Sequence, residues 1–423
     1  MQLPRAACWR RWIACLLGAF GLTLTVHAVA EAHATLLRSS PASNAVLSSS
    51  PASVRLEFSE EIDLSVSRVV VVGDSGSVAL ELSLDPHDVH VLVGRLPSLP
   101  SGAYRVTWAT VSADGHAVHG QYVFRVGAAN ALAPRMTASV VNGPRQTGVS
   151  LQAALRACGD FSLSLTAGLL LFVWLFAATG TAPARASRAM PIAALATVVL
   201  MAGRDVAWVV GTAPARADVG QWTASLLATQ QGIVEVARLG LALLVVWALL
   251  LMRRRNVALA FAALALACTG AVGHALAIQP LAAVPLKAAH ALAMSAWLGG
   301  LVWIVARERL QDAEFYAEAV VVSKVAFASV LVLALSGLGM TALFLPLRAS
   351  ALHSAYAELV ALKLLGLVGL ATLGFVQRRR RLPRVELDAA AGDAMRRLAR
   401  YEIAVMLLVF ALGACLSYTT PHP

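Results

Sequence analysis

Eight apolar runs, each about 20 residues long, fill most of the chain after residue 155, and they are the strongest constraint on its fold. They lie at residues 160–179, 190–211, 233–252, 256–278, 284–306, 320–345, 356–377 and 400–418. A helix needs about 20 apolar residues to cross the ~30 Å hydrocarbon core of a bilayer. With 58% hydrophobic and only 13% charged residues, the chain is too apolar for a soluble protein. The sequence therefore predicts an all-α polytopic membrane domain of eight transmembrane helices over residues 156–420.

Arginine clusters fall in every second loop between these runs, and their spacing predicts a topology. They are Arg185 with Arg188, Arg253–Arg255, Arg307 with Arg309, and Arg378–Arg381 with Arg384, Arg396, Arg397 and Arg400. The positive-inside rule makes these loops cytoplasmic, so the segment before the first run and the C-terminal tail are both outside. The net charge of +11 comes mainly from these loops, and no nucleic-acid motif accompanies it. We therefore expect a lipid bilayer as partner and no nucleic acid.

Residues 1–32 have the pattern of a secretory signal peptide. Three arginines precede an apolar stretch, residues 12–26, and the small residues Ala30 and Ala32 form a cleavage site. Cleavage after Ala32 makes His33 the first residue of the mature chain. Its α-amine and imidazole then offer two nitrogens to one metal ion, a pair that suits copper(II). The alternative is that cleavage falls nearby and His33 is an ordinary exposed residue.

Residues 33–127 lack the long apolar runs of the later chain and instead have the pattern of an all-β domain. Short β-branched and aromatic runs, such as Arg68–Val72 and Tyr104–Val111, alternate with turn signals such as Gly73–Gly76. Short strands separated by regularly spaced turns over about a hundred residues are typical of a β-sandwich or barrel. Residues 128–155 show no clear helix or strand periodicity and are rich in small residues. This composition indicates a linker before the membrane domain.

A carboxylate and an imidazole stand two residues apart inside the β segment, at Asp114 and His116. In extended backbone, such a pair points to the same face of the strand. Together with the two nitrogens of His33, they make three nitrogens and one oxygen, a plausible equatorial set for copper(II). The pair alone is a weak signal, because Asp114-Gly115 is also an ordinary turn.

Five stretches of the β segment resemble the periplasmic copper-binding CopC family in order and spacing. They are His33–Pro41, Val54–Glu60, Gly102–Trp108, Ser112–His116 and Gly120–Phe124. The resemblance implies a cupredoxin-like, immunoglobulin-like sandwich that binds copper(II) through His33, Asp114 and His116. Some CopC proteins also carry a methionine-rich copper(I) site. This chain has no methionine between His33 and Arg135, so we predict a domain that binds copper(II) only.

Inside the membrane segment, His290 and Met294 are the predicted copper pathway. They stand four residues apart in the fifth apolar run and so share a helix face. Polar groups inside membrane spans are costly, which makes them functional candidates. An imidazole and a thioether on one face suit the transfer of copper(I). The alternative is a histidine that hydrogen-bonds to a neighbouring helix beside a methionine that fills space.

The membrane segment resembles the CopD family of copper-resistance membrane proteins. The resemblance rests on His290 with Trp297–Gly300, on Leu335–Gly337, and on Glu358 with Lys363 followed by the Arg378–Arg381 run. The loop at Ser323–Phe327 departs from the usual Arg-Phe-Ser pattern of the family. A CopC-like segment followed by a CopD-like one in a single chain is similar to copper-import proteins of the YcnJ type.

These observations together predict a CopC–CopD fusion in a bacterial inner membrane that is not an enzyme. The outer domain captures copper(II), and the membrane domain passes copper, as copper(I), toward the cytoplasm. One alternative is copper resistance by periplasmic sequestration, or delivery to a cuproenzyme without import, with a periplasmic chaperone or cuproenzyme as partner. Another is a copper oxygenase with a histidine brace, which Asp114 disfavours because it occupies the equatorial position that oxygen needs.

The proposed copper(II) site depends on a free α-amine at His33. We expect residues 33–130 to bind copper(II) tightly when His33 is the first residue, and far more weakly when one extra residue precedes it. A spectroscopic copper(II) titration of the two forms measures this difference. Equal affinities would show that the site is wrong.

Overall fold

The computed structural model describes residues 36–64, 67–73, 76–111, 117–127, 147–177, 182–212, 227, 230–272, 280–307, 313–345, 355–385 and 389–417. These residues form two compact units, one of β-strands and one of helices, and each is described by itself. The predicted signal peptide and His33 lie outside the described residues, as does the predicted linker up to residue 146.

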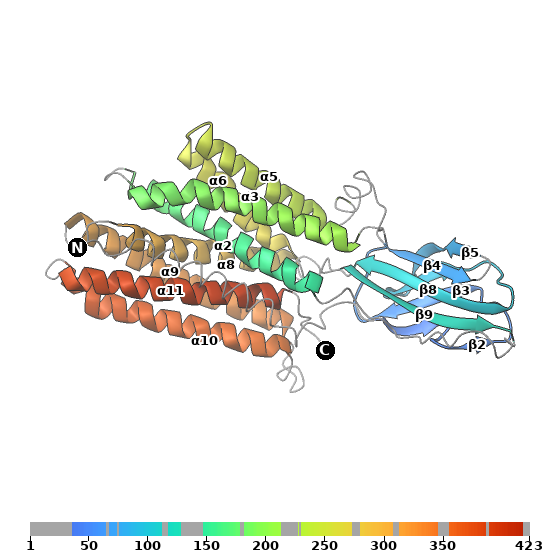
Figure 1. Ribbon diagram of the computed structural model, residues 1–423. Helices are drawn as coiled ribbons and strands as arrows, with labels where there is room; N and C mark the ends of the chain where they lie inside the picture. Colours follow the sequence, from blue (N-terminus) through green and yellow to red (C-terminus); the bar gives the residue numbers. More distant parts are fainter. Residues whose placement is uncertain are drawn as a thin grey trace. The chain divides into compact units, whose positions relative to one another are not determined.

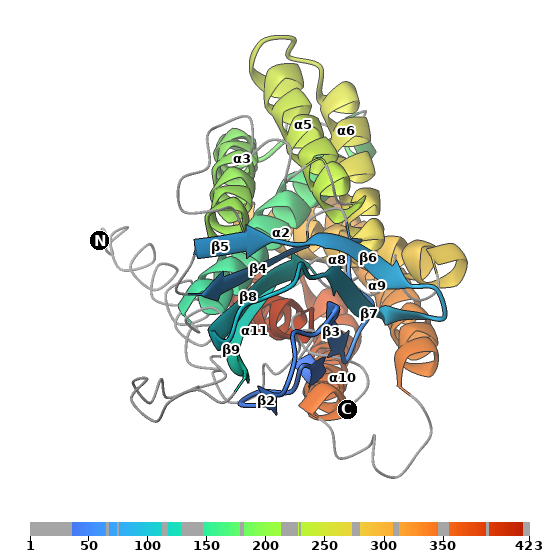
Figure 2. The ribbon, with the colours of Figure 1, turned by 90° about the vertical axis from the view of Figure 1, so that its right-hand side faces the viewer.

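The β unit is a sandwich of two sheets. One sheet has the order β1 (Leu36–Ser40), β3 (Ser53–Phe58), β7 (Asp88–Arg95), β6 (Glu81–Asp85). The other has the order β2 (Val46–Leu47), β9 (Ala117–Val126), β8 (Gly102–Val111), β4 (Arg68–Gly73), β5 (Gly76–Ala79). The pairs are antiparallel except β2 with β9, and Figure 2 shows β4, β8 and β9 side by side in one layer. The predicted all-β sandwich is confirmed.

Alternating side chains from both sheets fill the sandwich core. Along β3, Val54, Leu56 and Phe58 are buried and the residues between them are more exposed, as a strand period of two requires. Phe58 meets Trp108 of β8 edge to face, with ring centroids 5.1 Å apart. Trp108 lies opposite Gly120 of β9, where an added Cβ would come within 2.5 Å of the indole ring. The glycine therefore makes room for the tryptophan.

The helical unit consists of long helices that run side by side (Figure 1). They are α2 (Thr147–Leu175), α3 (Ala184–Thr212), α5 (Gln230–Leu250), α6 (Arg255–Cys268), α8 (Pro280–Ala306), α9 (Ala313–Phe344), α10 (Ala355–Val376) and α11 (Ala389–Leu416). The short helix η2 (Thr269–Ala271) extends α6, and η4 (Gln377–Arg381) and η5 (Leu382–Arg384) extend α10. Helix α2 begins at Thr147, so the end of the predicted linker is helical.

Seven of these helices are long and apolar enough to cross a membrane, in line with most of the predicted spans. The prediction of eight is not confirmed. The fourth predicted span, 256–278, corresponds to 14 residues of α6 and three of η2, which together form a shorter apolar helix. Beyond it, residues 273–279 lie outside the described part of the chain.

Contacts near the helix ends define two ends of the helical unit. At one end the start of α8 and the start of α10 meet the last residues of α9, through Ala283, Tyr356 and Phe344. We call this end the network end, after the ion-pair network described below. We call the opposite end the arginine-rich end, because Arg307 after α8 and Arg378–Arg381 after α10 lie there.

Helices α2 and α8 approach each other closely at a pair of glycines. An added Cβ on Gly299 would overlap the backbone of Gly168, and one on Gly168 would overlap the backbone around Ser295. Small residues allow helix backbones to approach in this way inside membranes. One turn away, the Ser295 hydroxyl donates to the Ser164 carbonyl at 2.8 Å. The glycines of the Trp297–Gly300 motif thus set the position of α8 against α2.

Candidate functional site

The three predicted copper(II) ligands, His33, Asp114 and His116, lie outside the described residues. Asp114 and His116 belong to residues 112–116, between the β8 and β9 strands, whose ends pair at Val111 and Ala117. The copper(II) site of the β unit therefore stays a prediction from sequence.

Two other histidines of the β unit lie on the surface, next to the β6–β7 turn. The backbone N–H of His87 donates to Asp85 Oδ1 at 3.0 Å, and Arg55 Nη2 pairs with Asp85 Oδ2 at 2.5 Å. The backbone N–H of His90 donates to Asp88 Oδ1 at 2.9 Å, and its ring contacts the same oxygen at 2.8 Å. These bonds, the backbone ones first, hold the pKa values of both carboxyls below their usual range. The two aspartates are occupied in forming the turn.

Within the described ranges, no group of three or more His, Cys, Asp or Glu side chains is arranged to hold a metal ion. The candidate site of the helical unit must therefore be built from fewer ligands. The predicted pathway residues His290 and Met294 both lie near the middle of α8.

The His290 ring is oriented by a hydrogen bond to the next helix. Its Nδ1 lies 2.9 Å from Ser336 Oγ of α9, and Ser336 Oγ donates to the Val332 carbonyl at 2.6 Å. Because the serine has one hydrogen and gives it to Val332, we infer that Nδ1–H donates to Oγ. The lone pair of the ring then lies on Nε2. A metal-binding histidine is commonly held by such a bond from its other nitrogen.

Met294 packs in the apolar core of the helical unit, one turn further along α8. The hydrogen bond of His290 and the burial of Met294 also agree with the alternative of a structural histidine and a space-filling methionine. In the tautomer with the hydrogen on Nδ1, the Nε2 lone pair is free to bind a metal. Nε2 and the thioether sulfur of Met294 are then both neutral ligand atoms that suit copper(I). The predicted pathway therefore stays a prediction with a defined ligand atom on His290.

A half-buried lysine from α10 lies near this histidine. Lys363 Nζ lies 3.6 Å from the position of an added Cβ on Gly413 of α11, and its charge acts on the His290 ring. Among the described residues it has no carboxylate partner.

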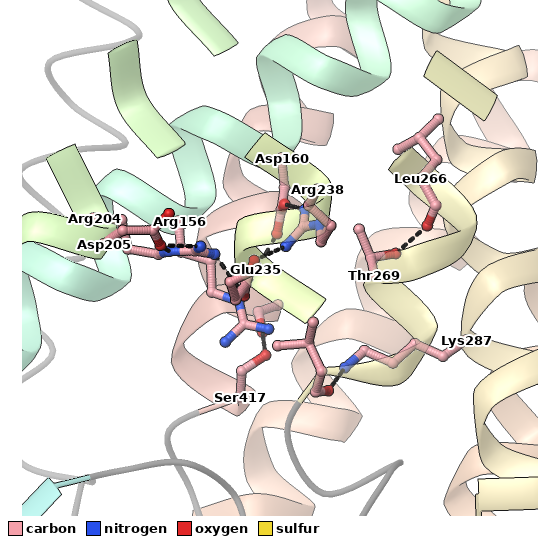
Figure 3. Close-up of polar contacts among 12 residues, drawn as sticks. Arg156, Asp160, Arg204, Asp205, Glu235, Arg238, Leu266, Thr269, Lys287 and Ser417 are labelled. Carbon is pink, nitrogen blue, oxygen red and sulfur yellow. Dashed lines mark hydrogen bonds and ion pairs between the residues drawn. The ribbon is translucent and has the colours of Figure 1, made fainter. Parts of the chain in front are cut away.

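Six charged side chains form an ion-pair network between α2, α3 and α5 (Figure 3). Its members are three arginines and three acids: Arg156, Asp160, Arg204, Asp205, Glu235 and Arg238. Arg238 joins Asp160 at 2.6 Å and Glu235 at 2.9 Å, and Arg204 joins Glu235 at 2.7 Å and Asp205 at 2.5 Å. The three charges of each sign cancel.

The network lies deep in the apolar unit, and Arg238 is fully buried. Charges in such a place cost several kcal/mol each unless they are paired, so each partner is needed by the others. Asp205 Oδ2 and Arg238 Nε are buried without a hydrogen-bond partner in the described structure. Nearby in Figure 3, Lys287 Nζ of α8 donates to the Val272 carbonyl after η2 at 2.5 Å. These contacts tie α2, α3 and α5 together, and tie α8 to the end of η2.

This network was not predicted from the sequence, although the sequence contains a signal for it. Arg204, Asp205, Glu235 and Arg238 are ionisable residues inside predicted apolar spans, which alone makes them functional candidates. Their pairing was hidden because the partners come from three different helices.

A second polar cluster lies at the arginine-rich end. Glu318 of α9 accepts hydrogen bonds from Trp303 Nε1 and pairs with Arg307 Nε, both at 2.9 Å. Arg307 also pairs with Glu314 at 3.2 Å, and its carbonyl accepts a hydrogen bond from Arg396. The ends of α8, α9 and α11 are thus joined by ion pairs and a backbone contact.

Comparisons with known proteins match both units in part. Residues 36–127 match the CopC domain family, and residues 321–416 match the family described as Copper resistance protein D, CopD. Copper resistance protein C of Escherichia coli is 33% identical over 117 residues, which cover 25% of this chain and 90% of that protein. Copper transport protein CutJ of Bacillus subtilis is 36% identical over 104 residues, which cover 23% of this chain and 19% of that protein. The match thus spans about a fifth of CutJ.

A solved structure also matches the β unit. The crystal structure of CopC from Methylosinus trichosporium OB3b aligns with 24% of this chain and 100% of its own length, at 26% sequence identity and a TM-score of 0.22.

The ion-pair network makes a prediction about stability. Replacing Arg238 by methionine leaves Asp160 and Glu235 without their shared cation, so we expect a loss of about 3–5 kcal/mol. The control R397M, at an exposed arginine of α11, should change stability by no more than about 0.5 kcal/mol. The double variant E235Q/R238M removes one charge of each sign and should recover part of the loss. Unfolding of the purified proteins in detergent measures all three, and equal stability of R238M and R397M would contradict the role of the network.

Proposed function

This chain belongs to the CopC family and joins a CopC domain to a CopD domain, and from that premise we propose that it captures copper(II) outside the membrane and imports copper. Both families handle copper, and CopC domains bind it, so copper binding and handling is the function of the chain. The observation that carries the proposal is the presence of both domains in one chain, since a captured ion is then delivered next to a membrane domain.

The apolar helices and the CopD match make the chain a multi-pass membrane protein. We propose that α6 and η2 form the eighth crossing. Together they are about 27 Å long, close to the ~30 Å hydrocarbon core. Two contacts support this arrangement: Lys287 near the start of α8 bonds the Val272 carbonyl, and an added Cβ on Gly270 would overlap the Val284 carbonyl. The end of η2 thus lies beside the start of α8, while α6 begins five residues after α5 ends.

With eight crossings, both ends of the chain lie on the same side of the membrane. The arginine clusters support a cytoplasmic arginine-rich end, by the positive-inside rule. The network end then faces the periplasm of a bacterial inner membrane, on the same side as the exported CopC domain. This orientation is what inward transport of captured copper requires.

We propose that copper passes His290 and Met294 as copper(I). The Nε2 lone pair of His290 and the thioether of Met294 are soft or borderline neutral donors, which favour copper(I) over hard cations. Ser336 supports this role because it accepts the Nδ1 hydrogen and leaves Nε2 as the ligand atom. In the proposal, an external thiol or other one-electron reductant gives one electron to each copper(II) ion before this step.

A second candidate function is copper resistance by periplasmic sequestration, without import. The observation in its favour is the similarity of the CopC domain to proteins named Copper resistance protein C. The two candidates predict opposite changes in cellular copper.

The direction of transport is tested by copper accumulation. At equal external copper, we expect cells that lack the gene to contain less copper than cells that carry it, because import adds to the internal pool. Elemental analysis of washed cells measures the difference. Higher copper in the deleted strain would contradict import and favour resistance.

The membrane pathway is tested by variants of α8 and α9. H290A should abolish copper uptake, and S336A should lower it by roughly ten-fold, the effect typical of losing the group that orients a metal-binding histidine. S329A is the matched control, because Ser329 is a buried serine of the same helix that does not bond His290. Copper(II) binding by the CopC domain should be unchanged in all three.

Full uptake by H290A, with copper binding retained, would contradict the pathway. Equal loss in S336A and S329A would instead indicate general damage to α9.

A further inference from the structure

Glu402 of α11 is a buried acid that has no cation partner among the described residues. Its side chain is 1% exposed. Its hydrogen-bond partner is a neutral amide: Gln377 Nε2, from the start of η4, donates to Glu402 Oε1 at 2.6 Å. The other buried acids of the helical unit differ, since Asp205, Glu235 and Glu318 each pair with an arginine. Something other than a described cation must therefore neutralise Glu402, or its charge is buried at a cost of several kcal/mol.

The partner amide has an unused acceptor. Gln377 Oε1 is buried and has no hydrogen-bond partner among the described residues. A proton on Glu402 Oε2 supplies the donor that this oxygen lacks, because a carboxylic acid gives one hydrogen bond and an amide oxygen accepts one. Protonation therefore removes a buried charge and satisfies a buried polar atom at the same time. An ionised carboxylate does neither.

No described arginine forms an ion pair with Glu402. On η4, Arg381 bonds the Ala394 carbonyl and Arg378–Arg380 are exposed, and Arg384 of η5 is exposed as well. On α11 itself, Arg396 bonds the Arg307 carbonyl. Arg400 is half-buried, and its Nε has no hydrogen-bond partner among the described residues; two residues from Glu402, it lies on another side of the helix.

Among the described residues, the other helices packed against α11 place no charged side chain at the level of Glu402. The last three turns of α8, residues 296–306, have no titratable side chain, and Lys287 and His290 are nearer its other end. On α10, Lys363 lies beside Gly413, three turns along α11 from Glu402. Helix α2, which touches α11 through Phe161 and Phe410, has no charged residue after Asp160.

We propose that Glu402 holds a proton in the resting protein and exchanges it against the copper ion that moves through the membrane domain. This inference rests on the proposed transport function. As copper(I) moves inward past this level, its charge stabilises the carboxylate, the O–H bond of Glu402 breaks, and the proton leaves outward. One positive charge replaces another, no electron is transferred, and rebinding of a proton restores the pair with Gln377.

The proton itself can be observed without transport. We expect infrared spectra of the full-length protein in lipid vesicles at neutral pH to contain a carboxylic-acid C=O band. E402Q should remove this band, and Q377L should shift it because the acid loses its hydrogen-bond partner. E318Q is the matched control, since Glu318 is ionised beside Arg307 and contributes no acid band. A band that survives intact in E402Q would overturn the proton site.

The exchange is measured in vesicles that contain the purified protein and a pH-sensitive dye, with copper(I) supplied in the presence of ascorbate. The wild type should release protons from the vesicle as copper enters. E402Q should lose proton release, and E402D should retain it, which guards against a variant that fails to fold. Unchanged proton release in E402Q would overturn the exchange. A wild type that has the acid band but moves no copper would refute the proposed transport and the exchange with it, and leave the proton site standing.

Discussion

The ion pairs of Arg238 fix the arrangement on which the rest of the helical unit depends. This arginine is fully buried and holds acids from α2 and α5 at hydrogen-bond distance. In a low-dielectric interior, separating such charges is far more costly than in water, so the helices keep one register. That register passes from α2 to α8 through Gly168 and Gly299, and from α8 to α9 through His290 and Ser336. The orientation of the predicted pathway histidine itself is set by its hydrogen bond to Ser336 of α9.

The helical unit neutralises its buried acids in two different ways. At the network end, Asp205 and Glu235 are balanced by arginines, which stay charged at any physiological pH, so these pairs are permanent. Toward the arginine-rich end, the described hydrogen-bond partner of Glu402 is an amide, so its proposed neutral state depends on a proton that can leave. The first arrangement suits a fixed scaffold. The second suits a group that changes charge during a transport cycle.

The strands and most of the spans could be predicted because they depend on local patterns. Alternation at Val54, Leu56 and Phe58 marks β3, and long apolar runs mark seven helices. The fourth span could not be settled in this way, since hydropathy does not reveal that α6 gives way to η2 at Thr269.

The site was less predictable than the fold. The interactions of its polar groups join residues far apart in the sequence. Asp160 and Arg238 are 78 residues apart, and His290 and Ser336 are 46 residues apart. A sequence pattern shows that such residues are unusual in a span, but not which of them meet. For His33, Asp114 and His116 the family resemblance remains the source of the prediction.

The charges of the network end explain why a transporter of this kind would need a capture domain. The six network charges cancel, and the half-buried Lys287 and Lys363 add two positive charges among the described interior side chains. The described side chains of this interior carry no net negative charge, so under the proposed function the membrane domain gains little from its own field in concentrating copper. A domain in the same chain with its own copper ligands raises the local concentration instead, as linked sites do. The neutral donors His290 and Met294 then compete for an ion already delivered to them, and the fusion of the two domains supplies what the membrane domain alone lacks.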